Sequence, residues 1–180
     1  MKKAVLGLVV VLFVCTLAVS AQPVGKKWEI GFGLSFSNFK FEGDSGSTSI
    51  LNIPFRVGYY VWKGLEIEPE VMLTKISDMD FGFNLAANLL YNFQLQGNFR
   101  PFILVGFGYG NGFAPYDALY IGDSDTNSTL INAGAGVKYL FGDRAAIRVE
   151  YRYSHNHMKW EEYSENVNTH KVLTGISLFF

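Results

Sequence analysis

Apolar residues alternate with small or polar residues in eight separate segments of this 180-residue chain. In the first segment, Trp28, Ile30 and Phe32 alternate with Glu29 and Gly31. Successive side chains of a β-strand point to opposite faces of a sheet, whereas a helix repeats every 3.6 residues, so this period of two predicts strands. Eight strands are therefore expected, at residues 28–37, 51–59, 65–74, 81–93, 103–110, 131–141, 147–154 and 171–180.

The connections between these segments alternate in length. Short turns are expected at residues 61–64, 94–98 and 142–144, and longer polar loops at residues 42–49, 75–80, 111–128 and 155–169. An antiparallel barrel with an even number of strands gives this rhythm when both termini lie at one end. The sequence therefore predicts an all-β fold, a closed eight-stranded antiparallel barrel.

The N-terminus has the features of an export signal. Lys2 and Lys3 precede an uncharged apolar run over residues 4–19, and small residues follow at Ser20 and Ala21. This pattern predicts a signal peptide of residues 1–21 that is cleaved, leaving residues 22–180 as one barrel domain. The apolar run is shorter than the ~20 residues that a membrane-spanning helix needs.

Alternation alone does not say which face of the barrel points outward. A secreted lipocalin-like barrel turns its apolar face inward around a ligand, whereas a membrane barrel turns that face to lipid. The polar face here is mostly Gly, Ala, Asn and Ser, which suits the narrow interior of an eight-stranded barrel. Charged residues make up 17% of the chain, against about 25% in an average soluble domain. These features favour a transmembrane barrel.

Aromatic side chains gather near the strand ends, as they do in the girdles at the two interfaces of a membrane. They are Trp28, Trp62, Tyr91, Phe93, Tyr139, Phe141, Tyr153 and Phe180. We therefore expect the barrel to lie in a membrane, surrounded by lipid. The formal net charge of −1 argues against nucleic acid as a partner, because such binders carry a basic field.

Four segments carry a resemblance to a known family. Residues 100–108, 132–137 and 148–154 resemble the small outer-membrane β-barrel proteins of the OmpA/OmpX-like and opacity types. Residues 172–180 end in Phe180, with Leu178 and Ile176 behind it, and resemble the C-terminal signal that the barrel-assembly machinery reads in bacterial outer-membrane proteins. The resemblance covers residues 22–180. It implies an outer-membrane location, with lipid and lipopolysaccharide as the surroundings, and a barrel with a plugged lumen.

Charged residues on the small-residue face are the first candidates for a site. They are Arg56, Glu66, Glu68, Glu70, Lys138, Arg148, Glu150 and Arg152. A carboxylate inside a narrow barrel needs a cationic partner to remain ionised, so an interior ion-pair network is expected. The network could plug the lumen and fix the strand register, or it could line a gated ion path. The OmpA-like resemblance implies the plug.

The expected last outer loop carries His155 and His157. Together with residues 150–153 and 167–170, these resemble the lipid A deacylase family (PagL), which uses a His-x-Ser pair and a downstream acid to remove an acyl chain from lipopolysaccharide. The resemblance implies His155 as the base and places His157 where that family has its Ser nucleophile. Without the hydroxyl, no acyl-enzyme forms by that route. A lipid A 3-O-deacylase (acyloxyacyl hydrolase) is therefore the alternative function, and a wet surface loop is the simpler interpretation.

Neither a metal nor a cofactor is expected. Catalytic zinc sites use three protein ligands, and His155 and His157 supply two. Residues 122–127 begin like a calcium loop, but Ser128 stands at its glycine position and Gly134 at its bidentate glutamate position. The sequence thus favours a structural barrel, or one that binds an extracellular ligand through its outer loops.

Overall fold

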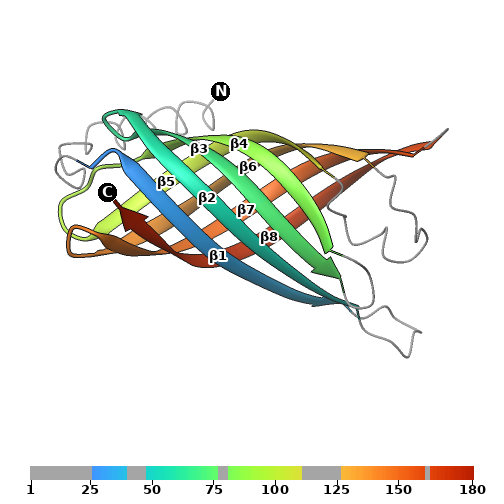
Figure 1. The fold of residues 1–180 in the computed structure, drawn as a ribbon, viewed down its shortest axis with the longest axis horizontal. Helices are drawn as coiled ribbons and strands as arrows, with labels where there is room; N and C mark the ends of the chain where they lie inside the picture. Colours follow the sequence, from blue (N-terminus) through green and yellow to red (C-terminus); the bar gives the residue numbers. More distant parts are fainter. Residues whose placement is uncertain (1–25, 40–47, 77–80, 111–126, 161–162) are drawn as a thin grey trace, which may run out of the picture.

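The computed structural model describes residues 26–39, 48–76, 81–110, 127–160 and 163–180, which form one closed antiparallel barrel (Figure 1). Its strands are β1 (Trp28–Phe39), β2 (Thr48–Trp62), β3 (Leu65–Ile76), β4 (Phe81–Asn92), β5 (Phe99–Gly110), β6 (Asn127–Phe141), β7 (Ala145–Trp160) and β8 (Tyr163–Phe179). Each strand pairs with the next along the chain, and β1 pairs with β8 to close the sheet. The expected eight-stranded barrel is confirmed.

Short turns lie at one end of the barrel, called here the turn end. They join β2 to β3, β4 to β5 and β6 to β7. β1 also begins and β8 ends here, where Glu29 pairs with Phe179. Gly64 and Gly142 have φ values of 75° and 64°, a left-handed conformation that glycine adopts without a steric penalty. The opposite end is called the loop end.

The apolar face of the sheet points outward. Along β3, Ile67 and Leu73 are 45% and 42% exposed, whereas Glu66 and Glu68, on either side of Ile67, are completely buried. The same alternation runs through the other strands, because successive side chains of a strand take opposite faces. This orientation is that of a membrane barrel and the reverse of a soluble one.

Exposed aromatic side chains ring the turn end. Trp28, Trp62, Phe141 and Phe180 are each at least half exposed. Trp28 also packs on Tyr59, with 4.8 Å between the ring centroids. Such a ring of outward aromatic side chains is expected where a barrel meets the membrane interface.

The last hairpin corrects one prediction. Of residues 155–169, expected as an outer loop, residues 155–160 and 163–169 instead continue β7 and β8. These strands pair in unbroken register up to Trp160 and Tyr163 and reach past the other strands (Figure 1). The apolar alternation stops at Tyr153, but backbone pairing does not require apolar side chains. The sequence pattern therefore underestimated the length of both strands.

The interior near the turn end contains larger apolar side chains than the sequence pattern suggested. Leu90, Phe102 and Leu104 form one buried cluster. Phe102 fills space opposite Gly136, where an added Cβ would lie 2.5 Å from the Phe102 ring. A second buried cluster contains Tyr60, Leu140, Ala146 and Phe179. The lumen therefore contains large apolar side chains as well as small and polar ones.

Several predictions concern residues outside the described ranges. These are the signal peptide (1–21), most of the three loops at 42–49, 75–80 and 111–128, and the calcium-loop-like run at 122–127. In the parts of the chain that the structure describes, no helix is long and apolar enough to cross a membrane.

Candidate functional site in the barrel lumen

The structure places all eight predicted charged residues on the inner face of the barrel. None of them is more than 3% exposed. They come from β2, β3, β6 and β7, so residues far apart in sequence meet across the lumen. Strand parity explains why they point inward: Glu66, Glu68 and Glu70, and likewise Arg148, Glu150 and Arg152, stand at every second position of their strands.

The middle of the network is centred on Arg148. Its guanidinium binds Glu68 through two hydrogen bonds of 2.5 and 3.2 Å, and its Nη2 donates to Glu150 Oε2 at 2.7 Å. The guanidinium also lies 4.5 Å from the centre of the Phe102 ring. A planar guanidinium with two carboxylates and an aromatic ring is held in one orientation.

A second layer lies toward the loop end. Arg152 binds Glu70 through two hydrogen bonds of 2.5 and 3.0 Å and Glu150 through one of 2.6 Å. From the other side, Arg56 Nε donates to Glu70 Oε2 at 2.6 Å. Glu70 and Glu150 thus each bridge two arginines, which links β2, β3 and β7 across the lumen.

The third layer lies near the turn end and contains residues that the sequence analysis did not include. Lys138 Nζ donates to Glu29 Oε2 at 2.6 Å and to Glu66 Oε2 at 3.0 Å. The Tyr60 hydroxyl donates to Glu29 at 2.7 Å, and the Asn92 amide to Glu66 at 2.8 Å. Glu29 shares the face of Gly31 and Gly33, so its parity was a usable signal for its inward position.

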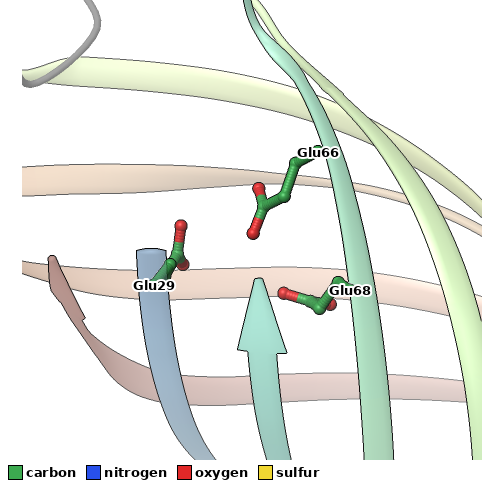
Figure 2. Close-up of side chains that lie close together, drawn as sticks. All are labelled: Glu29, Glu66 and Glu68. Carbon is green, nitrogen blue, oxygen red and sulfur yellow. The ribbon is translucent and has the colours of Figure 1, made fainter. Parts of the chain in front are cut away.

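Three carboxylates of this region face one another (Figure 2). Oxygen atoms of Glu29, Glu66 and Glu68 all lie within 4.8 Å of each other, and within the described ranges this is the one such group of three acidic, His or Cys side chains. Oxygen clusters of this kind suit hard cations. Here, however, the ammonium of Lys138 binds two of the three carboxylates and Arg148 binds the third. The chain itself supplies the positive charge.

The two histidines of the deacylase resemblance lie elsewhere. His155 and His157 are on the outward face of β7, beyond Tyr153. Their Nδ1 atoms hydrogen-bond to Asn168 and Asn166 of β8, at 2.7 and 2.8 Å. Ser154, between Tyr153 and His155, points into the barrel and is buried. The structure therefore brings neither histidine to the interior network.

The three residues of the expected assembly signal lie on the outer surface of β8 and just after it. Ile176, Leu178 and Phe180 are 57%, 40% and 60% exposed. The backbone of Phe180 is tied to β1 by hydrogen bonds in both directions with Trp28, at 2.9 and 3.2 Å. The last residue therefore belongs to the seam that closes the barrel.

Solved structures share this fold. Neisserial surface protein A (NspA) has 16% sequence identity and a TM-score of 0.62, covering 85% of this chain and 96% of its own. The N-terminal β-barrel domain of Pseudomonas aeruginosa OprF has 17% identity and a TM-score of 0.53, covering 86% and 98%. A de novo designed transmembrane β-barrel has 15% identity and a TM-score of 0.51, covering 90% and 100%.

The sequence itself also identifies the family. No curated protein matches the chain. The model of the outer membrane protein beta-barrel domain, however, matches residues 6–180. Together with the outward apolar face and the aromatic ring, this match places the chain in an outer membrane of Gram-negative type. The chain therefore belongs to the outer membrane protein beta-barrel domain family, as a small eight-stranded member.

Proposed function

We propose that the protein is a structural outer-membrane barrel whose lumen is plugged, not a porin. The interior network carries this proposal. Nine buried charged side chains, the predicted eight and Glu29, are joined by ion pairs that cross the lumen from β1, β2 and β3 to β6 and β7. Removing one partner of a buried ion pair costs about 3–5 kcal/mol, so opening a continuous path through the network is unfavourable.

An aromatic ring supports the same proposal. The Phe102 ring lies between the turn-end and middle layers, with Lys138 Nζ 5.5 Å and the Arg148 guanidinium 4.5 Å from its centre. A cation beside an aromatic face is attracted to it. Phe102 also packs with Leu90 and Leu104, so an apolar cluster adds to the ionic barrier.

Planar-bilayer recording tests the plug. We expect purified wild-type protein to show no large, steady conductance. The double variant Phe102→Ala/Leu104→Ala, which removes inward side chains, should raise conductance. The matched double variant Val105→Ala/Phe107→Ala, which alters outward positions of the same strand, should not. A large, steady conductance of the wild type contradicts the proposal, and so does equal behaviour of the two variants.

The cellular role that follows is envelope integrity, or binding of an extracellular ligand through the outer loops. Barrel-assembly machinery that reads Phe180, Leu178 and Ile176, and surrounding lipopolysaccharide, are the proposed partners. Replacing residues 111–126 by a short Gly/Ser linker separates the two roles. If the variant loses surface binding while the permeability barrier of the envelope is unchanged, the loop role is favoured. If the envelope becomes more permeable while surface binding is unchanged, the structural role is favoured.

A lipid A deacylase is the second candidate. It is supported by the position of His155 on β7, just beyond the apolar band toward the loop end. His157 offers no hydroxyl, and the hydroxyl of Ser154 is on the other face of the strand. Mass spectrometry of lipid A from expressing and non-expressing cells tests it. Loss of an acyl chain from lipid A on expression, abolished by His155→Ala, would establish deacylase activity and contradict a purely structural role.

A further inference from the structure

The lumen contains a small polar cavity on the loop side of the Arg152–Glu70 ion pair. Its volume is about 20 Å³, and Asn132, Thr169 and Lys171 are among the side chains that line it. A space of this size holds a water molecule or an ion of similar size. The cavity lies beyond the plug, so a ligand can occupy it without crossing the barrel.

Lys171 is the unusual charge in this cavity. It is paired in register with Arg152 on the adjacent strand, which puts two cations at directly opposed positions. Like charges placed opposite each other destabilise a sheet unless an anion balances them. Arg152 is balanced by Glu70 and Glu150. Among the described residues, no carboxylate forms an ion pair with Lys171.

The neutral contacts of Lys171 are weak. Its Nζ donates to Asn52 Oδ1 at 3.3 Å, and the same oxygen accepts a hydrogen bond of 3.1 Å from Thr74. An ammonium has three N–H donors, and Asn52 Oδ1, which Lys171 shares with Thr74, accepts only one of them in a long hydrogen bond. Glu70 is the acidic residue that lines the cavity, but Arg152 and Arg56 already bind both of its oxygens.

A second observation points to a ligand in the same place. Among the residues that the structure describes, the Thr169 hydroxyl, in a residue only 7% exposed, finds no hydrogen-bond partner, and neither does Asn132 Oδ1, in a residue 1% exposed. Thr169 lies two residues before Lys171 on the inner face of β8, so its hydroxyl and the ammonium serve the same cavity. Water can satisfy the neutral groups, whereas an anion would in addition offset the charge of Lys171, which is partly buried beside Arg152.

The distribution of charge in the lumen agrees with this. The network of nine residues has five glutamates but only four cations (Lys138, Arg56, Arg148 and Arg152), and Lys138, at the turn end, serves both Glu29 and Glu66. The surplus carboxylate of this network therefore lies at the turn end, whereas the ammonium of Lys171 lies outside the network, at the loop end. The layers of Arg148 and Arg152 separate the two.

We propose that Lys171 and Thr169 bind a small monovalent anion in this cavity, either a halide or the carboxylate group of a small organic acid. The ammonium supplies the charge and the threonine hydroxyl a second hydrogen bond. The anion reaches the cavity from the loop end. This binding is independent of the plugged lumen, because it requires no passage through the ion-pair layers.

Chloride-35 NMR line width tests the proposal on the full barrel in a zwitterionic detergent. We expect saturable excess broadening with wild-type protein. Lys171→Met should weaken it by about tenfold or more, because a charge-assisted hydrogen bond contributes about 1.5–3 kcal/mol. Thr169→Val should weaken it by a smaller factor. Heat-modifiable mobility on a gel verifies that each variant is folded.

Lys63→Met is the matched control, since it removes the same charge from an exposed position in the turn between β2 and β3. It should bind chloride like the wild type. Absence of saturable broadening, equal broadening by Lys171→Met and wild type, or equal loss in Lys63→Met overturns the proposal. If formate displaces chloride, the site also accepts a carboxylate group. If formate does not displace chloride, binding of small organic acids is overturned.

Discussion

Replacing Lys138 by methionine removes the cation on which the turn-end layer depends. Methionine keeps most of the side-chain length but cannot donate to the two carboxylates that Lys138 binds at 2.6 and 3.0 Å. Lys138, Glu29 and Glu66 are each at most 1% exposed, so water cannot replace the lost ammonium without rearrangement of the barrel. Two buried carboxylates are then left without their cation.

The expected loss of stability is large. A hydrogen bond to a charged group contributes about 1.5–3 kcal/mol, and Lys138 makes two of them to carboxylates. Removing one partner of a buried ion pair typically costs about 3–5 kcal/mol. We therefore expect Lys138→Met to lower the free energy of unfolding by about 3–5 kcal/mol.

Reversible urea unfolding of the barrel in detergent or in lipid vesicles measures this difference. The rescue variant Lys138→Met/Glu29→Gln/Glu66→Gln removes the charges together and should recover most of the loss, because neutral amides do not need a buried cation. Lys63→Met, which removes an exposed cation, should unfold like the wild type. A loss below about 1 kcal/mol for Lys138→Met, or no recovery in the rescue variant, refutes the reasoning.

Three further outcomes are expected. Val105→Arg, on the outward face of β5, should lower the free energy of unfolding by about 2–4 kcal/mol in vesicles, because the guanidinium enters lipid near the middle of the strand; the same unfolding assay measures it. Gly136→Val should cost about 1–3 kcal/mol in that assay, because the new side chain overlaps the Phe102 ring. Phe180→Ser should reduce the amount of folded barrel in outer-membrane fractions, scored by heat-modifiable mobility, while the purified variant still folds in detergent; normal assembly in cells contradicts the proposed signal.

The period of two determined the fold class and the direction of the side chains. Because successive residues of a strand take opposite faces, the parity of Arg148, Glu150 and Arg152 was enough to place all three inside. The three short turns likewise indicated that the strands they join are antiparallel neighbours. These inferences needed no knowledge of contacts between distant residues.

The extent of the last hairpin could not be predicted in this way. His155 and His157 continue β7, although the apolar signal has ended. Their cross-strand hydrogen bonds to Asn168 and Asn166 are side-chain contacts that no hydrophobic pattern records. Polar strands beyond the apolar band therefore looked like a loop.

Which charges pair was decided by the closed barrel alone. Glu29 and Lys138 are 109 residues apart, and only the register and closure of the sheet bring them to 2.6 Å. The same geometry leaves Lys171 opposite Arg152, without a carboxylate of its own among the described residues. Sequence parity tells which way a side chain points, but its height along the barrel and its neighbour across the lumen depend on the stagger of all eight strands. The sequence therefore determined the barrel and its two faces, and the tertiary structure decided the ion pairs and the cation left over at the loop end.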